Sequence, residues 1–197
     1  PQNLVRWYNA AKLASQDNSW EVVIVSPYDL PEELDRISNI TFIKSDRNPV
    51  VCKQIAGLFC RGKFIFNTTD DGLLFPNSID KMIDLWETEK LNKYDLINAR
   101  YREGALSVET LVPLENPPPE LPSEYWTAWH HQSLRLPAIK KEWKISLHFF
   151  MLLDSFYKIG GLNCIGFENS VFPILELCFY LQNNGGKLID SEEEVSW

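Results

Sequence analysis

The 197-residue sequence predicts an α/β fold in a single domain. Short apolar runs alternate with helical patterns through the first hundred residues. The run at residues 21–25 is continuous and rich in β-branched residues, which is typical of a strand covered on both faces. The length is sufficient for one full core but leaves little room for a second. These observations predict a mostly parallel sheet flanked by helices.

The first predicted element is a helix over residues 4–15, which has apolar side chains at helical spacing and follows a suitable N-cap, Asn3. The Val-rich run at residues 21–25 then predicts a buried strand. A second strand is predicted at residues 39–43, and a helix at residues 49–59. The order strand, strand, helix continues the α/β pattern.

A third strand, at residues 63–67, leads directly into an acidic turn. A helix over residues 76–89 and a strand over residues 94–99 follow. Ligands in parallel sheets bind beyond the carboxyl ends of the strands. The turn that contains Asp70 and Asp71 is therefore the first candidate site.

The second half of the chain has a different character. Residues 102–123 are rich in proline and read as irregular. A strand is predicted at residues 146–151 and a helix at residues 171–183. The acidic stretch at residues 190–194 is expected to be solvated.

Charge and cysteine spacing limit the functions open to the chain. The formal net charge of −8 argues against nucleic-acid binding as a main role. None of the four cysteines lies in a CxxC pair, so we expect reduced thiols and no zinc site. No apolar run approaches the length of a membrane span, and no signal-peptide pattern opens the sequence. Together these features predict a cytoplasmic protein without a membrane span.

The strongest local signal lies between residues 50 and 76, and it resembles the donor half of the family 2 glycosyltransferases. Members of that family have a small-residue helix bearing Arg-Asn, a glycine before a strand, an Asp-x-Asp-Asp motif and a following proline. Here Lys53-Gln54 stand at the Arg-Asn position and Ala56 at the family's glycine, while Gly62 precedes the strand. Thr69-Asp70-Asp71 stand at the acidic motif, and Pro76 follows at the expected distance. Further along, Gly160-Gly161 resembles the Gly-Gly pair that precedes the family's acceptor-side acidic residue.

This resemblance implies a GT-A fold across residues 1–197, with a nucleotide-sugar-binding half at about 1–100 and an acceptor half at about 101–197. It implies transfer of a hexose from a nucleotide sugar to a saccharide or other hydroxyl acceptor, with inversion. A divalent cation, Mn²⁺ or Mg²⁺, would neutralise the leaving diphosphate. Asp71 is the expected metal ligand, with Asp70 beside it. The alternative is that Asp-Asp-Gly is only a turn after a strand.

The sequence departs from the family pattern at three places. Thr69 occupies the first acidic position of the motif, and a hydroxyl is a weaker ligand than a carboxylate. Ser26 and Asp29 stand where the family has paired acidic residues, so we expect them to contact the donor, unless Asp29 is an ordinary loop residue. The family's first strand, which lines the nucleotide pocket, is expected to be missing. Lys53 is expected to meet the diphosphate.

Inverting transfer also needs a general base on the face of the sugar opposite the leaving group. Glu168, which follows Gly160-Gly161 and precedes a helix, is the predicted base, although it could instead be a charge at the helix start. Glu176 is the alternative base. His130 and His131 lie among tryptophans that could form an acceptor platform or a self-packed lid.

Two other classes of protein compete with the glycosyltransferase interpretation. A degenerate glycosyltransferase-like domain would bind sugar or protein without catalysis, and the changes at Thr69 and Ser26 favour it. A nucleotidyltransferase would need a glycine-rich phosphate loop after its first strand, and the sequence has none.

Overall fold

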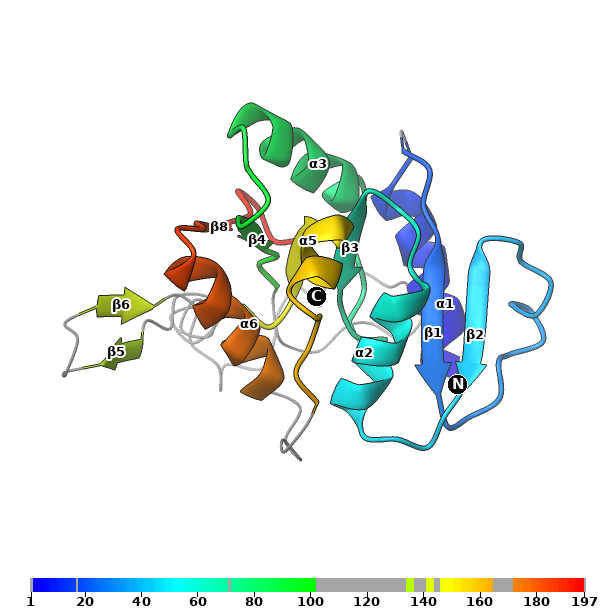
Figure 1. The fold of residues 1–197 in the computed structure, drawn as a ribbon. Helices are drawn as coiled ribbons and strands as arrows, with labels where there is room; N and C mark the ends of the chain where they lie inside the picture. Colours follow the sequence, from blue (N-terminus) through cyan, green and yellow to red (C-terminus); the bar gives the residue numbers. More distant parts are fainter. Residues whose placement is uncertain are drawn as a thin grey trace, which may run out of the picture.

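Helices and strands alternate along the described part of the computed structural model, which comprises residues 2–16, 18–70, 72–101, 134–136, 141–143, 146–164 and 172–196 (Figure 1). In chain order the elements are α1 (Gln2–Ala14), β1 (Val22–Ser26), β2 (Ile40–Lys44), α2 (Pro49–Phe59), β3 (Phe64–Asn67), α3 (Ser78–Thr88), β4 (Leu96–Asn98), β5 (Leu134–Leu136), β6 (Lys141–Trp143), β7 (Phe149–Leu152), α5 (Leu153–Lys158), α6 (Phe172–Asn183) and β8 (Leu188–Asp190). The fold is therefore mixed α/β, as predicted.

The strands form three sheets. β1 and β2 pair in parallel, from Val22 opposite Ile40 to Ser26 opposite Lys44. A four-stranded sheet has the order β3-β7-β4-β8, and a short antiparallel pair is formed by β5 and β6. β7 runs antiparallel to both of its neighbours, whereas β4 and β8 are parallel.

The larger sheet is therefore mixed and differs from the mostly parallel sheet that the alternation of elements predicts. Local patterns identify a strand but leave its direction open. β7 pairs antiparallel with β3 and β4, and the sequence alone did not indicate this direction. Because β3 and β4 both run against β7, they point the same way, as expected. The carboxyl ends of β3, β4 and β8 thus share one edge with the amino end of β7.

Helix α2 begins at the residue that its N-cap and first proline predict. The side chain of Asn48 accepts a hydrogen bond from the backbone N–H of Val51 at 3.0 Å, and Pro49 supplies the fixed φ of the first turn. Gly57 lets α2 approach the rest of the molecule closely, since a Cβ there would lie 2.6 Å from the Phe156 ring and 3.6 Å from the Ile65 side chain. α2 therefore packs against both β3 and α5.

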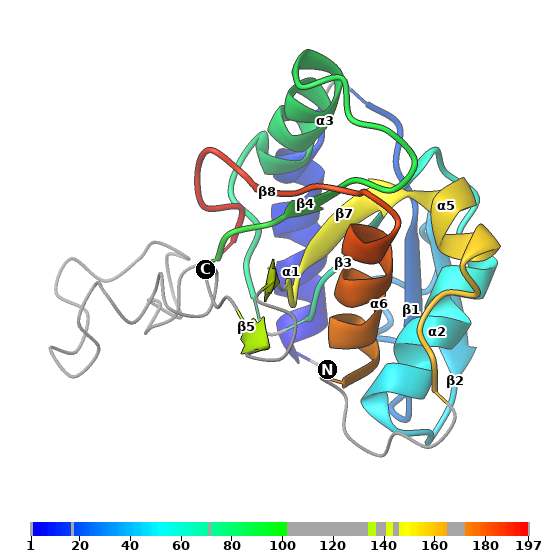
Figure 2. The same ribbon diagram turned by 60° about the vertical axis from the view of Figure 1, so that its left-hand side comes forward.

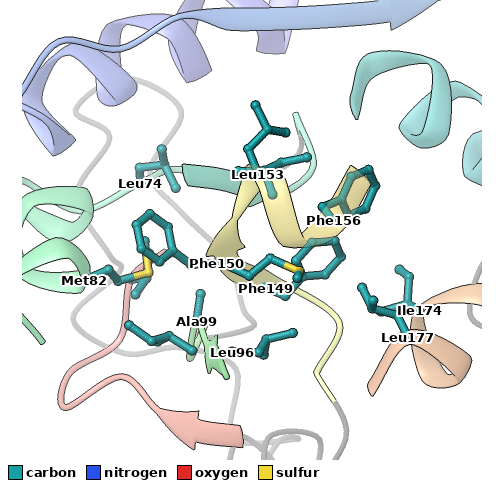
Figure 3. Close-up of a cluster of buried hydrophobic side chains, with 14 of the residues drawn as sticks. Leu74, Met82, Leu96, Ala99, Phe149, Phe150, Leu153, Phe156, Ile174 and Leu177 are labelled. Carbon is teal, nitrogen blue, oxygen red and sulfur yellow. The ribbon is translucent and has the colours of Figure 1, made fainter. Parts of the chain in front are cut away.

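The core lies around β7, in which Phe149, Phe150 and Met151 are each 2% exposed or less. Figure 3 shows Phe149 and Phe150 among side chains from α3, α5, α6 and β4, which include Met82, Phe156, Leu177 and Leu96. The rings of Phe64 and Phe150 stack with centroids 4.7 Å apart, and Trp86 meets both rings edge-on. Burial of these large apolar groups is the main stabilising term of the fold.

Four elements were not expected from the sequence: β5, β6, α5 and β8. β8 corrects the prediction that residues 190–194 are solvated, because Asp190 belongs to a strand and Ser191 is buried. Glu192 and Glu193 are exposed, as expected. None of the described helices is long and apolar enough to cross a membrane.

Candidate functional site

Polar residues gather at the edge where β3, β4 and β8 end. Asn67, Asn98 and Asp190 are the last residues of these three strands, and Ser146 and His148 precede β7 at the same edge. Both asparagines and Ser146 are buried, with exposed fractions of 9%, 3% and 1%. Buried polar side chains are costly unless they are hydrogen-bonded, so their partners show what holds this edge.

Asn98 is the centre of the hydrogen-bond network at this edge. Its Nδ2 donates to Asp190 Oδ1 at 2.7 Å, and its Oδ1 lies 2.7 Å from the Ser146 hydroxyl. The same hydroxyl lies 2.8 Å from the His148 carbonyl, and Asn67 donates to the Leu147 carbonyl at 3.0 Å. These contacts fix the segment that enters β7 against the ends of three strands.

His148 is half-buried. Its ring lies 4.7 Å from the ring of Tyr101 at an interplanar angle of 30°. Tyr101 follows β4 and is bridged to Ser196. An aromatic pair therefore lies beside the buried polar network.

The acidic turn leaves β3 at this edge. Thr68 and Thr69 are half-buried, and Asp70 is exposed. The Thr68 Oγ1 is buried without a hydrogen-bond partner among the described residues, and Asp70 makes no ion pair with any of them. Asp71 lies outside the described residues. The turn thus offers one available carboxylate and one unsatisfied hydroxyl.

A hard divalent cation requires several oxygen ligands. No group of three His, Cys, Asp or Glu side chains within the described ranges is placed to hold a metal ion. The carboxylate of Asp70 and the neighbouring threonine hydroxyls are chemically suited to Mn²⁺ or Mg²⁺, which would complete its coordination with the diphosphate of a substrate and with water. The described residues therefore supply only part of the oxygen ligands that such a cation needs.

The predicted donor contacts at β1 lie at that strand's carboxyl end. Ser26 is the last residue of β1, is half-buried, and its Oγ accepts a hydrogen bond from the Tyr28 N–H at 3.2 Å. Asp29 has a side chain that is 86% exposed and forms an ion pair with Lys44. Figure 1 shows β1 and β3 running in the same direction, so Ser26 and the acidic turn lie at corresponding ends of their strands.

Helix α2 presents Lys53 and Gln54 one turn after it begins. Lys53 is half-buried. Gln54 donates to the Gly160 carbonyl at 3.2 Å and accepts from the Leu162 N–H at 2.6 Å. The position that resembles the family's Arg-Asn pair is therefore joined directly to the Gly160-Gly161 turn.

The predicted base, Glu168, lies outside the described residues, as do His130 and His131. Its alternative, Glu176, is exposed on α6. The Asn98 network and the contact made by Gln54 were missed by sequence reasoning. An asparagine at the end of a strand was the available sequence signal for the Asn98 network. No local pattern indicates the contact made by Gln54.

The cysteines are poor candidates for a nucleophile. Burial, with a smaller contribution from the charge of Glu21, raises the pKa of Cys60 to about 11. Burial also raises the pKa of Cys178 to about 12 and raises that of Cys164. These three thiols stay protonated near neutral pH, and all four cysteines are free.

No model of a known protein family matches this chain, and no curated protein matches it either.

Proposed function

We propose that this chain is a GT-A-like glycosyltransferase that moves a hexose from a nucleotide sugar to a hydroxyl acceptor, with inversion and with a divalent cation. The acidic turn after β3 carries the proposal. It combines an exposed carboxylate at Asp70 with an unsatisfied buried hydroxyl at Thr68. A buried hydroxyl without a partner is costly, so a polar ligand that supplies the missing hydrogen bond would be favoured there.

The donor would lie along the carboxyl ends of the strands. Ser26 would hydrogen-bond the base, with Asp29 beside it once that carboxylate leaves Lys44. Lys53 would meet the diphosphate as a point charge. Asp70 and Asp71 would hold the cation, and the cation would offset the negative charge that develops on the diphosphate during transfer.

In the reaction, the acceptor oxygen forms a bond to the anomeric carbon while the bond from that carbon to the diphosphate oxygen breaks. The bonding electrons leave with the diphosphate. The hydroxyl proton passes to a carboxylate on the opposite face of the sugar, and Glu168 is the proposed acceptor of that proton. The acceptor is a saccharide or another molecule with a free hydroxyl group.

A second candidate function is binding without catalysis. Asp29 is already ion-paired with Lys44, and Thr69 replaces a carboxylate in the motif. Both features weaken the donor and metal contacts on which transfer depends. A binding domain of this kind would hold a sugar or a protein but would release no nucleotide product.

The test is titration calorimetry with UDP-sugars and GDP-sugars, with and without manganese, followed by an assay for release of the nucleoside diphosphate. We expect saturable binding that needs manganese and that is lost in Asp70→Asn and in Asp71→Asn. Asp35→Asn is the matched control, because Asp35 is also exposed but lies in the loop between β1 and β2. Binding that is indifferent to both the metal and the Asp70 and Asp71 variants would refute the proposed donor site.

A further inference from the structure

A groove of about 440 Å³ lies between α3 and the segment that follows β8. One wall is the side of α3 that carries Ser78, Lys81 and Leu85, which are three or four residues apart and so share one helix face. The other wall consists of residues 191–195, the red segment that follows β8 in Figure 2. Sites for small molecules typically have volumes of about 300–1,000 Å³, so the groove has the size of such a site.

The wall that follows β8 is held in place by hydrogen bonds to two other segments. The Phe75 N–H donates to the Val195 carbonyl at 2.9 Å. The Ser191 hydroxyl accepts from the Arg100 N–H at 3.0 Å and donates to the Glu193 carbonyl at 2.7 Å. A ligand would therefore enter a groove that is already formed, so that little chain has to be ordered on binding.

The groove combines apolar and acidic side chains, and part of its negative charge is not neutralised. Glu193 is ion-paired with Lys81 of the opposite wall at 2.5 Å, and Glu194 lies 3.9 Å from the Arg100 guanidinium. Asp84 and Glu192 make no ion pair with any described residue. The acidic residues of the lining are Asp84, Glu192, Glu193 and Glu194, and its apolar residues include Met82, Leu85 and Val195. The lining therefore favours a ligand that is both cationic and apolar.

A buried hydroxyl in the lining independently indicates a ligand. Ser78 is 4% exposed, lies on the helix face that lines the groove, and its Oγ is buried without a hydrogen-bond partner among the described residues. A buried hydroxyl without a partner is costly, so a ligand that donates an N–H to this oxygen would be favoured. The carboxylate of Asp80, in the first turn of α3, offsets the positive end of the helix dipole, so a cation is tolerated near Ser78.

The placement of the carboxylates favours an elongated cation over a metal ion. A divalent metal ion needs several oxygen ligands that converge on one centre. No three His, Cys, Asp or Glu side chains in the described part of the chain converge in this way. The carboxylates without an ion-pair partner belong instead to opposite walls, Asp84 to α3 and Glu192 to the segment after β8. A ligand whose positive charges are separated from one another matches this arrangement.

We propose that this groove binds an aliphatic polyamine. Its ammonium groups pair with Asp84 and Glu192, and one of them donates a hydrogen bond to the Ser78 hydroxyl. The methylene groups between the charges cover the apolar side chains of Met82 and Leu85, as the stem of a lysine side chain covers apolar surface. None of these residues has a role in the proposed transfer reaction, so the polyamine site and the proposed function can fail separately.

The first test is titration calorimetry of the whole chain with spermidine at low salt, where ion pairs are least screened. We expect saturable binding that weakens about threefold in Asp84→Asn and in Glu192→Gln, and about tenfold when both are changed. The matched control is Glu89→Gln, which removes an exposed carboxylate at the end of α3 but outside the groove. The absence of saturable binding, or an equal loss in the control, would overturn the proposal.

Ser78→Ala separates binding from stability. We expect it to weaken spermidine binding about fivefold, because one hydrogen bond to the ligand is lost. The urea midpoint of the free protein should not fall, because the hydroxyl has no hydrogen-bond partner among the described residues. Unchanged affinity in Ser78→Ala would contradict the contact with the ligand.

Replacement of Lys81 should have the opposite effect on affinity. Lys81→Gln releases the carboxylate of Glu193 to the ligand, so we expect spermidine to bind about threefold more tightly. Lys44→Gln is the matched control, because Lys44 is also exposed and ion-paired at 2.5 Å, but with Asp29 outside the groove. Equal tightening in both variants would show that spermidine responds only to the net charge of the protein, which would overturn the assignment to the groove.

The last comparison tests whether separated charges are required. Butylamine has a single ammonium group, so we expect it to bind at least about tenfold more weakly than spermidine. Magnesium chloride should displace spermidine no better than sodium chloride at the same ionic strength. Equal affinity for the two amines, or preferential displacement by magnesium, would overturn the polyamine as the ligand.

Discussion

The side chain of Gln54 hydrogen-bonds the residues on either side of Gly161. Its Oε1 accepts from the Leu162 N–H at 2.6 Å and its Nε2 donates to the Gly160 carbonyl at 3.2 Å. A Cβ on Gly161 would lie 2.3 Å from the Gln54 Oε1, and Gly161 has a positive φ of 70°. The second turn of α2 and the turn after α5 are therefore joined, although they are far apart in the sequence.

Replacement of Gly161 by alanine tests how tight this unit is. A side chain at that position is strained by the positive φ and also collides with Gln54, so we expect Gly161→Ala to lower the free energy of unfolding by about 3 kcal/mol. Gly160→Ala is the matched control, because Gly160 has a φ of 86° but open space around it. We expect about 1 kcal/mol there. Urea denaturation of both variants measures the difference, and equal losses would mean that the collision is relieved cheaply.

Substitution of Gln54 tests the other side of the same contact. Gln54→Leu leaves the Leu162 N–H and the Gly160 carbonyl without partners, so we expect a loss of about 2 kcal/mol in the free energy of unfolding. Gln54→Glu keeps the acceptor for Leu162 but loses the donor to Gly160, and it should lose less. The same urea titration ranks the variants, and a Gln54→Leu protein as stable as the parent would contradict the role of this amide.

The elements that the sequence predicted well are those with local signals. Helix α2 spans Pro49–Phe59, as expected, because Asn48 caps it and Pro49 starts it. The four strands of the first half lie within two residues of their predicted limits, because each contains a short, mainly apolar segment bounded by polar or turn residues. Helix α5 was missed because it follows β7 without a break in apolar sequence, which hides the boundary between the two elements.

The candidate site was predictable only where it follows a strand. Asp70 could be placed at a strand end, and the structure places it there. The pairing of β4 with β8, and hence the Asn98–Asp190 hydrogen bond, could not be predicted because strand partners are chosen by tertiary packing. The contact between Gln54 and the Gly160-Gly161 turn has the same cause, and it shows why distant pairs escape a reading of local patterns.

A buried carboxylate on α3 offers a test of stability away from the candidate site. Asp80 is 6% exposed and accepts hydrogen bonds from the Gln16 N–H at 2.7 Å, from Asn18 at 2.8 Å and from the Ser15 hydroxyl at 3.1 Å. It thereby ties the end of α1 to the start of α3. In Asp80→Asn an N–H donor replaces one acceptor, so we expect a loss of about 2–3 kcal/mol.

The control is Asp84→Asn, one turn further along the same helix, where the side chain is exposed. We expect a change within about 0.5 kcal/mol there, as for most surface substitutions. Chemical denaturation followed by circular dichroism measures both variants. If the two substitutions lowered the free energy of unfolding equally, the hydrogen bonds to Asp80 would not stabilise the fold.

The thiol of Cys60 gives a prediction of pH dependence. Its pKa is raised to about 11 because burial, and secondarily the charge of Glu21, disfavours the thiolate. Since the thiolate is the reactive form, about one molecule in a thousand should be reactive at pH 8. We expect the rate of alkylation by iodoacetamide to rise about tenfold per pH unit up to about pH 10.

Mass spectrometry resolved by site measures the alkylation of Cys60 separately from that of the other cysteines. Glu21→Gln removes the nearby negative charge, which lowers the pKa and should raise the rate at pH 8. A rate that levels off near pH 8.5 in the parent protein would contradict the raised pKa.

The last prediction concerns the general base of the proposed transfer reaction. A carboxylate must receive the hydroxyl proton from the face of the sugar opposite the diphosphate, and Glu168 follows the turn that Gln54 holds against α2. Glu168→Gln keeps the shape of the side chain but cannot accept the proton. We expect transfer to fall on the order of a hundredfold or more, while the affinity for the nucleotide sugar changes little.

The matched control is Glu176→Gln, because Glu176 is exposed on α6 a short distance along the chain. Its transfer rate should equal that of the parent if Glu168 is the base. Release of nucleoside diphosphate measures the rate, and calorimetry with manganese measures donor binding in the same samples. A rate that falls in Glu176→Gln and not in Glu168→Gln would reassign the base to α6. If neither variant changes a measurable rate, the proton must pass to another group, because removal of a general base cannot leave the barrier to transfer unchanged.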